Sequence, residues 1–142
     1  MGFFWTKERL FKKSMLRVAY LFAFAACFIA TEIGRRVYRP FIYRNHIDDG
    51  GIADSIGNSL GTLTQIFLYL GLAHATRTES YRIIAFVTVG YIAYEIVQPI
   101  LPRGTFDIKD VIATLAAGSF AAILVTVMHH YFPEREKGSI PP

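Results

Sequence analysis

Two long stretches without a formal charge constrain this 142-residue chain more than any other feature. Residues 55–76 form a run of 22 such residues, and residues 111–133 form a run of 23. At about 1.5 Å per residue, either run as a helix crosses a hydrocarbon core of about 30 Å. Only 18% of the residues are charged and there is one cysteine, whereas soluble domains carry about 25% charged residues. The composition excludes a soluble enzyme, a disordered tail and a disulfide scaffold, and predicts one membrane domain over residues 1–142.

Two further apolar stretches are interrupted by single charges. The first lies between Arg17 and Glu32, and the second lies between Arg82 and Arg103 and contains Glu95 as its one charge. A long arginine side chain at a helix end reaches the membrane surface, which extends the first stretch towards residue 14. We therefore expect an all-α membrane protein, a bundle of four transmembrane helices at about residues 14–34, 54–76, 82–101 and 110–132.

The charges predict an orientation. The N-terminal tail, the 77–82 loop and the C-terminal tail share one side and carry nine lysines and arginines, whereas the loops around 35–53 and 102–109 carry six. The excess predicts that both termini are cytoplasmic. Seven of the eleven carboxylates gather on the other side. The juxtamembrane basic residues suit anionic lipid headgroups, and no nucleic-acid-binding motif accompanies them, so we expect membrane lipids and no nucleic acid as partners.

The two halves of the chain share a pattern. Each half has a helix that ends near a glutamate, an arginine-bearing loop, an aspartate and then a polar residue one helical turn later. The first half supplies Glu32, Asp54 and Asn58, and the second supplies Glu95, Asp110 and Thr114. This pattern predicts two similar helical hairpins. The alternative is that both aspartates are simply helix N-caps.

Polar residues also fall on single faces of the predicted helices. One face carries Asp54, Asn58, Thr62, Gln65 and Tyr69, and another carries Thr88, Tyr91, Glu95 and Gln98. Facing lipid, these groups would lack hydrogen-bond partners, so we expect the faces to meet around a polar cleft. The last helix offers Asp110, Thr114, Ala117, Gly118 and Ala121 on one face, where small residues permit close helix contacts.

The segment over residues 95–112, EIVQPILPRGTFDIKDVI, resembles the signature of the VanZ-like family, which is named for a bacterial teicoplanin-resistance protein. The family pattern is approximately Glu-x-x-Gln, then a proline-arginine element, then Asp-x-x-Asp entering a last membrane helix. The matching residues are Glu95, Gln98, Arg103, Asp107 and Asp110, with Asp54 from an earlier helix. The chain departs from the pattern at Asn58, where the family has histidine, at Thr114, where it has asparagine, and at Ala117, where it has glycine. The resemblance implies a short multi-pass protein of the bacterial inner membrane, and it implies no particular reaction, because most members of the family have none assigned.

Glu95 is the most informative residue, because a lone carboxylate inside a membrane span costs about 2.5–3.5 kcal/mol. We expect Arg103, Arg35 or Arg36 to meet it. Two interpretations remain: a buried ion-pair network that fixes helix packing, or a recognition site for an envelope lipid or polar headgroup. In the second, arginines bind phosphate and carboxylates orient hydroxyls or a divalent cation. The candidate ligand-binding residues are Glu95, Gln98, Arg103, Asp107, Asp110, Asp54, Asn58 and Glu32.

Two other functions stay open. The chain could be an accessory structural subunit of a larger membrane protein complex, or a small lipid-headgroup enzyme in which Glu95, Asp107 and Asp110 bind magnesium or calcium. The sequence has no nucleophile elbow, phosphate-binding glycine loop or His-Glu-x-x-His motif. Catalytic residues therefore remain unassigned, no metal ligands are assigned, and the sequence leaves open whether there is a cofactor.

Overall fold

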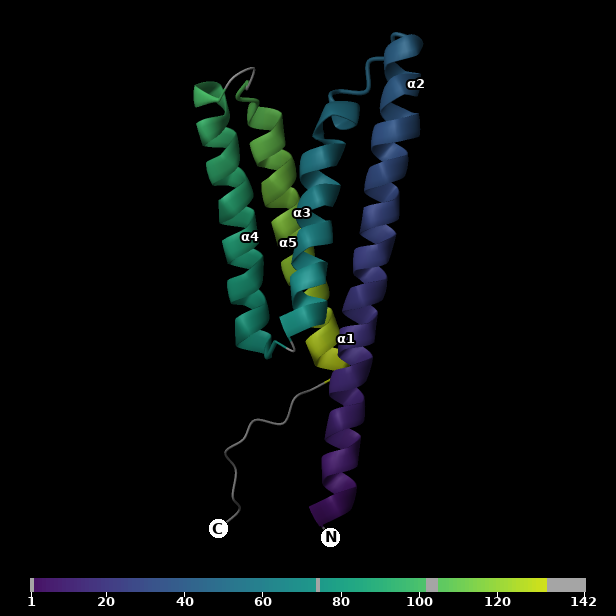
Figure 1. Ribbon diagram of the computed structural model, residues 1–142, viewed down its shortest axis with the longest axis vertical. Coiled ribbons are helices and arrows are strands. Elements are labelled where there is room, and N and C mark those ends of the chain that lie inside the picture. The colour runs from purple at the N-terminus through teal and green to yellow at the C-terminus, as the bar shows by residue number, and fades with distance from the viewer. Residues whose placement is uncertain (1, 74, 102–104, 133–142) are drawn as a thin grey trace.

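The computed structural model describes residues 2–73, 75–101 and 105–132, with side chains from residue 14 onward. Within these ranges every regular element is a helix. The order is α1 (Gly2–Ile33), a π-helical turn (Gly34–Tyr38), α2 (Arg39–Arg44), α3 (Ile52–Ala73), α4 (Arg77–Val97), a 3-10 turn (Gln98–Ile100) and α5 (Ile108–Tyr131). The four long helices run alternately up and down, so the start of α1 and the end of α5 lie at the same end (Figure 1).

Three of these helical segments are long and apolar enough to cross a membrane. They are Ser14–Arg44, Arg77–Ile100 and Ile108–Tyr131. The fourth predicted span, residues 54–76, corresponds to α3, which is 22 residues long but carries polar residues throughout its first half. The position of α3 explains why it can carry polar residues, because it contacts α1, α4 and α5. A helix enclosed by other helices presents its polar side chains to protein rather than to lipid.

The prediction of a loop over residues 35–53 is wrong for residues 35–44. There the first helix continues through the π-helical turn and α2 to Arg44. Pro40 interrupts the pattern, since proline has no backbone N–H to donate. The chain accommodates it with wider hydrogen bonding, in which the N–H of Arg39 donates to the carbonyl of Gly34, and with Pro40 in the first turn of α2. That position is the one in a helix where proline costs least.

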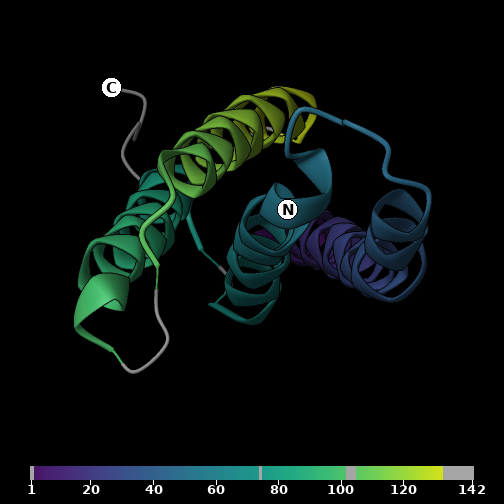
Figure 2. The ribbon, with the colours of Figure 1, turned by 90° about the horizontal axis from the view of Figure 1, so that it is seen from above.

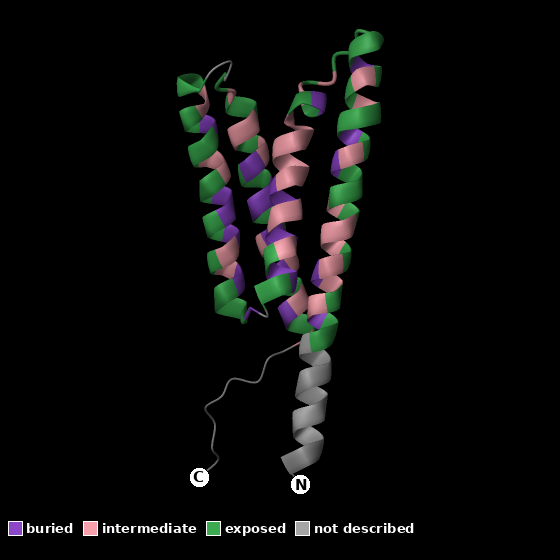
Figure 3. Ribbon diagram, in the orientation of Figure 1, coloured by how far each residue is buried: buried purple, intermediate pink, exposed green. Residues whose placement is uncertain are grey.

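The apolar core occupies the part of the bundle around the C-terminal half of α3. Its buried members come from all four long helices and include Leu16, Tyr20, Leu63, Ile66, Phe67, Leu70, Ile84, Val87, Ala121 and Val125. The rings of Tyr20 and Phe67 stack with centroids 6.4 Å apart. Buried residues follow the faces that the helices turn towards one another (Figure 3). Viewed from above, α5 lies against both α3 and α4 (Figure 2).

Two polar contacts fix the helix ends at the opposite end from α2. The Nε of Arg17 donates to the carbonyl oxygen of Gly71 at 2.9 Å, which joins α1 to the last turn of α3. The side chains and backbone N–H groups of Thr76 and Glu79 form a reciprocal capping box at the start of α4. Both contacts satisfy backbone groups that a helix end leaves without partners.

Gly118 sets how closely α5 approaches α4. A Cβ atom at Gly118 would overlap the Thr88 side chain. The predicted small-residue face of α5 is confirmed, because Thr114, Ala117, Gly118 and Ala121 are all buried. Close backbone approach of this kind strengthens van der Waals packing between membrane helices.

We expect Gly118→Ala to lower the free energy of unfolding by about 1–3 kcal/mol, because an extra methyl group must displace the Thr88 side chain. Gly90→Ala is the matched control, since a Cβ there would meet no atom within 4 Å. Thermal unfolding of the detergent-solubilised variants measures the difference. Equal midpoints for the two variants would contradict the packing described for α4 and α5.

Candidate functional site

Three helices bring polar side chains together around Glu95, in the half of the bundle nearer α2. Glu95 is on α4 and fully buried, with no exposed surface. The side-chain amide of Asn58 on α3 donates to Glu95 Oε1 at 3.1 Å, and the amide of Gln98 donates to the same oxygen at 2.7 Å. Asp110, near the start of α5, interacts electrostatically with Glu95. We call Asn58, Glu95, Gln98 and Asp110 the polar cluster.

The polar cluster has more acceptors than donors. Both amide donors serve Oε1 of Glu95, so its Oε2 is buried without a hydrogen-bond partner, and Oδ1 of Asp110 is in the same condition. The carboxylates of Asp110 and Asp107 act on Glu95 with the same sign of charge. Among the residues that the structure describes, no lysine or arginine forms an ion pair with Glu95. The described residues of the cluster therefore supply fewer hydrogen-bond donors than acceptors, and none of them is positively charged.

Buried threonines extend the polar cluster along the helices. Thr62 lies one turn after Asn58 and donates to its carbonyl oxygen at 2.6 Å. Thr114, one turn after Asp110, has a buried hydroxyl with no partner, and so has Thr88 on α4. Buried polar groups in native proteins nearly always have partners. The carboxylate oxygens of Glu95 and Asp110 need donors, whereas the threonine hydroxyls can either donate or accept.

The start of α5 explains how Asp110 reaches this position. Asp107 is the N-cap of α5, and its carboxylate accepts from the backbone N–H of Lys109 at 2.8 Å. Asp110 is therefore in the first turn, free of a capping role. At α3 the carboxylate of Asp49 accepts from the N–H groups of Gly51 and Ala53 at 3.0 and 2.7 Å. The alternative that Asp54 and Asp110 are the N-caps of their helices is wrong.

The hydrogen bonds of Asp49 also change its acidity. Burial acts to raise the pKa of this carboxyl group, but the N–H groups of Ala53 and Gly51 and the hydroxyl of Tyr38 favour its charged form. Together they hold the pKa below its usual value. The hydroxyl of Tyr38 donates to Asp49 Oδ2 at 3.1 Å, so the carboxylate links the π-helical turn to the start of α3.

Asp54 belongs to a different set of contacts from the one that the sequence predicts. Its Oδ1 pairs with Nη2 of Arg39 at 3.0 Å and accepts from the hydroxyl of Tyr43. We call Arg39, Tyr43 and Asp54 the surface triad, because all three side chains are exposed. The triad joins α2 to the first turn of α3, and it does not contact Glu95.

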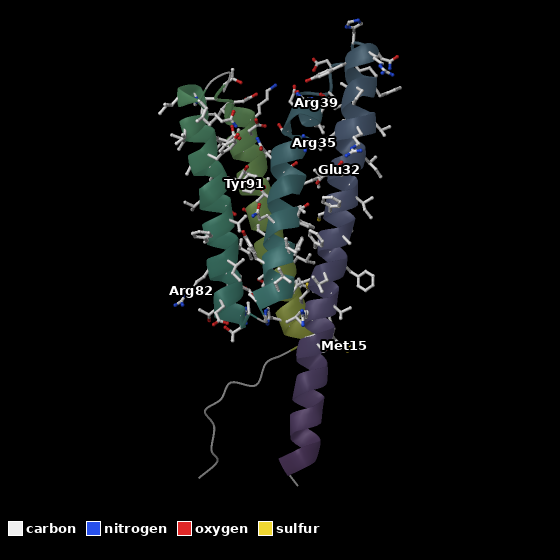
Figure 4. The ribbon with its side chains drawn as sticks, viewed as in Figure 1. Met15, Glu32, Arg35, Arg39, Arg82 and Tyr91 are labelled. Carbon is white, nitrogen blue, oxygen red and sulfur yellow. The ribbon has the colours of Figure 1, made fainter. Side chains whose placement is uncertain are left out.

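Glu32 also lies apart from Glu95. It pairs with Arg36 one turn away, with Nε and Oε2 separated by 2.7 Å. Arg35 is exposed, and Figure 4 shows Glu32, Arg35 and Arg39 along the α1–α2 helix, on the other side of α3 from α4. The predicted contact of Arg35 or Arg36 with Glu95 is therefore absent. Arg103, the other predicted partner, lies outside the described residues.

The polar faces of α3 and α4 meet again below the polar cluster. The hydroxyl of Tyr91 donates to Oε1 of Gln65 at 3.3 Å, and Nε2 of Gln65 donates to the hydroxyl of Tyr69 at 3.0 Å. Together with Phe86, Val87, Gly90 and Tyr94 these residues line a groove of about 270 Å³. Figure 4 shows Tyr91 directed from α4 towards the interior of the bundle.

Among the described residues, no group of three or more histidine, cysteine, aspartate or glutamate side chains is arranged to hold a metal ion.

Comparisons of the chain with models of protein families, with curated proteins and with solved structures give no match.

We expect Asn58→Ala to be more destabilising than Glu95→Gln. Removing the Asn58 amide strands part of a buried carboxylate, at a cost of about 1–3 kcal/mol. In Glu95→Gln the new Oε1 still accepts from both amides, and the new Nε2 places a donor near Asp110, so stability should be equal or higher. Thermal unfolding in detergent measures both effects.

Asn45→Ala is the control for loss of an amide, because Asn45 is exposed and bonds only to the carbonyl of Phe41. This variant should unfold close to wild type. The described arrangement of Glu95 would be contradicted if Glu95→Gln were the most destabilising of the three variants.

Proposed function

We propose that the chain is a multi-pass membrane protein of the VanZ-like type, in which α3 is a fourth transmembrane helix inside a bundle of two hairpins. Its 22 residues give a length of about 33 Å, and it packs against α1, α4 and α5. In this proposal the protein lies in the bacterial inner membrane with both termini in the cytoplasm, and the polar cluster opens towards the outer surface. The lysines and arginines on the side of the termini support the orientation.

We propose that the polar cluster binds the polar headgroup of an envelope lipid. The observation that carries the proposal is the free Oε2 of Glu95, which is fully buried and has an unsatisfied Asp110 oxygen near it. A carboxylate in this environment requires a hydrogen-bond donor or a positive charge. A headgroup that supplies either one completes the cluster.

The acceptors in the cluster define the chemistry of the headgroup. Glu95 is buried, whereas Asn58, Gln98 and Asp110 are partly exposed, so a ligand would approach Glu95 past these three side chains. An ammonium group or a hydroxyl on the ligand would donate to Glu95 Oε2 and Asp110 Oδ1. The Lys109 amino group extends towards Gly51 at the start of α3, where it provides a positive charge for the adjoining phosphate.

Removing one charged acceptor should weaken lipid binding without unfolding the protein. We expect Glu95→Gln and Asp110→Asn to retain about tenfold less phosphatidylethanolamine than wild type, because a hydrogen bond to a charged group contributes about 1.5–3 kcal/mol. The measurement is native mass spectrometry of protein extracted from vesicles of phosphatidylethanolamine and phosphatidylglycerol, at equal folded yield.

Glu32→Gln and Asp48→Asn are matched controls, since each removes one carboxylate away from the polar cluster and should leave lipid retention unchanged. Identical retention in all five proteins would make the polar cluster a structural network. The accessory-subunit function would then lead, and other protein chains should copurify with this one.

A further inference from the structure

The groove between α3 and α4 begins below the polar cluster, where Gln65 and Tyr91 continue the faces of Asn58 and Glu95. It extends from there onto the exposed face of α4 that carries Phe86, Gly90 and Tyr94. Tyr91 precedes Glu95 by one helical turn, and Gln65 follows Asn58 by about two turns. At about 1.5 Å per residue these offsets are roughly 6 and 10 Å along the helices. The polar cluster is nearer the ends of the helices and the groove is deeper in the bundle, which is the order of polar and apolar parts in a lipid that stands in a membrane leaflet.

The lining of the groove is aromatic and apolar in character. Phe86, Tyr91 and Tyr94 come from α4, Tyr69 comes from α3, and Gly90 leaves open space because a Cβ there would meet no atom within 4 Å. The polar atoms of Gln65 are paired with the hydroxyls of Tyr91 and Tyr69. Because these groups satisfy one another, the groove does not demand a polar ligand.

The groove is small. Its volume is about 270 Å³, whereas pockets for drug-sized ligands have volumes of about 300–1,000 Å³. Phe86 and Tyr94 are 79% and 55% exposed, so the groove opens outward from a helix that is long and apolar enough to span a membrane. A hydrocarbon chain is the ligand that this aromatic and apolar lining and this apolar environment favour.

We infer that the groove holds one hydrocarbon chain of the lipid whose headgroup lies at the polar cluster, an inference that rests on the proposed function. The ligand is therefore an amphiphile bound at two points. Its headgroup donates to Glu95 and Asp110, and the first part of its chain packs on Tyr91, Tyr94 and Phe86. This arrangement would distinguish a bound lipid from the lipids that surround any membrane protein.

A photoactivatable phospholipid tests the inference. The probe is phosphatidylethanolamine with a diazirine on one acyl chain, in vesicles of phosphatidylethanolamine and phosphatidylglycerol, and the crosslinked residues are mapped by mass spectrometry. In wild type we expect crosslinks concentrated on the groove residues of α3 and α4. Gly90→Leu fills the groove and should reduce these crosslinks about tenfold, the effect of losing contact with about two methylene groups.

Ala85→Leu is the matched control, because it adds the same side chain at an exposed position of α4 that does not line the groove. A second pair keeps the test independent of how Gly90→Leu folds. Phe86→Ala should reduce the crosslinks, and Phe120→Ala, which removes a 54% exposed phenylalanine from α5, should not.

The outcomes separate the groove from the headgroup site. The inference is overturned if crosslinks spread evenly over the exposed faces of α1 and α5 and Gly90→Leu has no effect. If Glu95→Gln still reduces lipid retention in that case, the proposed function stands without the groove. If Gly90→Leu removes the crosslinks while Glu95→Gln retains lipid as wild type does, the groove stands and the headgroup site fails.

Discussion

The buried carboxylate of Glu95 is the constraint on which the rest of the polar architecture depends. A carboxylate with no exposed surface, in a helix long and apolar enough to span a membrane, must be compensated from within the bundle. Asn58 and Gln98 compensate one of its two oxygens, and nothing in the described chain compensates the other. The proximity of Asp110 increases the imbalance, because it adds a second unsatisfied acceptor and a charge of the same sign. A structure that needed only helix packing would not require this excess of acceptors.

The placement of α3 follows from the same constraint. Its amide at Asn58 must reach Glu95 on α4, and α5 must approach α4 closely enough for Asp110 to lie nearby. The contact of Gly118 with Thr88 permits that approach. Because α3 contacts three other helices, its polar residues can face protein.

The sequence predicts the helical class, the long apolar helices and the small-residue face of α5, because charge-free length and helical periodicity are local properties. It also predicts that Asn58, Glu95 and Gln98 share an environment, since lipid exposure is costly for each of them. It does not predict that Asp54 pairs with Arg39 and Tyr43, because the loop between residues 35 and 53 is in part a continuation of the first helix. The roles of Asp49 and Asp107 at helix starts were equally hidden, since any of the nearby aspartates could have capped its helix. Symmetry between the halves was a poor guide here: Asp54 lies in an exposed triad, whereas Asp110 reaches the polar cluster.

Nuclear magnetic resonance of the carboxyl groups tests the central claim most directly. Protein with ¹³C-labelled glutamate and aspartate side chains, in bicelles with and without phosphatidylethanolamine, reports each carboxylate separately, and single substitutions assign the signals. We predict that the Glu95 and Asp110 signals shift when the lipid is added, while the signal of Glu32, which is paired with Arg36 away from the polar cluster, stays in place. Shifts confined to Glu32 and Asp54, or unchanged signals from Glu95 and Asp110, would contradict the account.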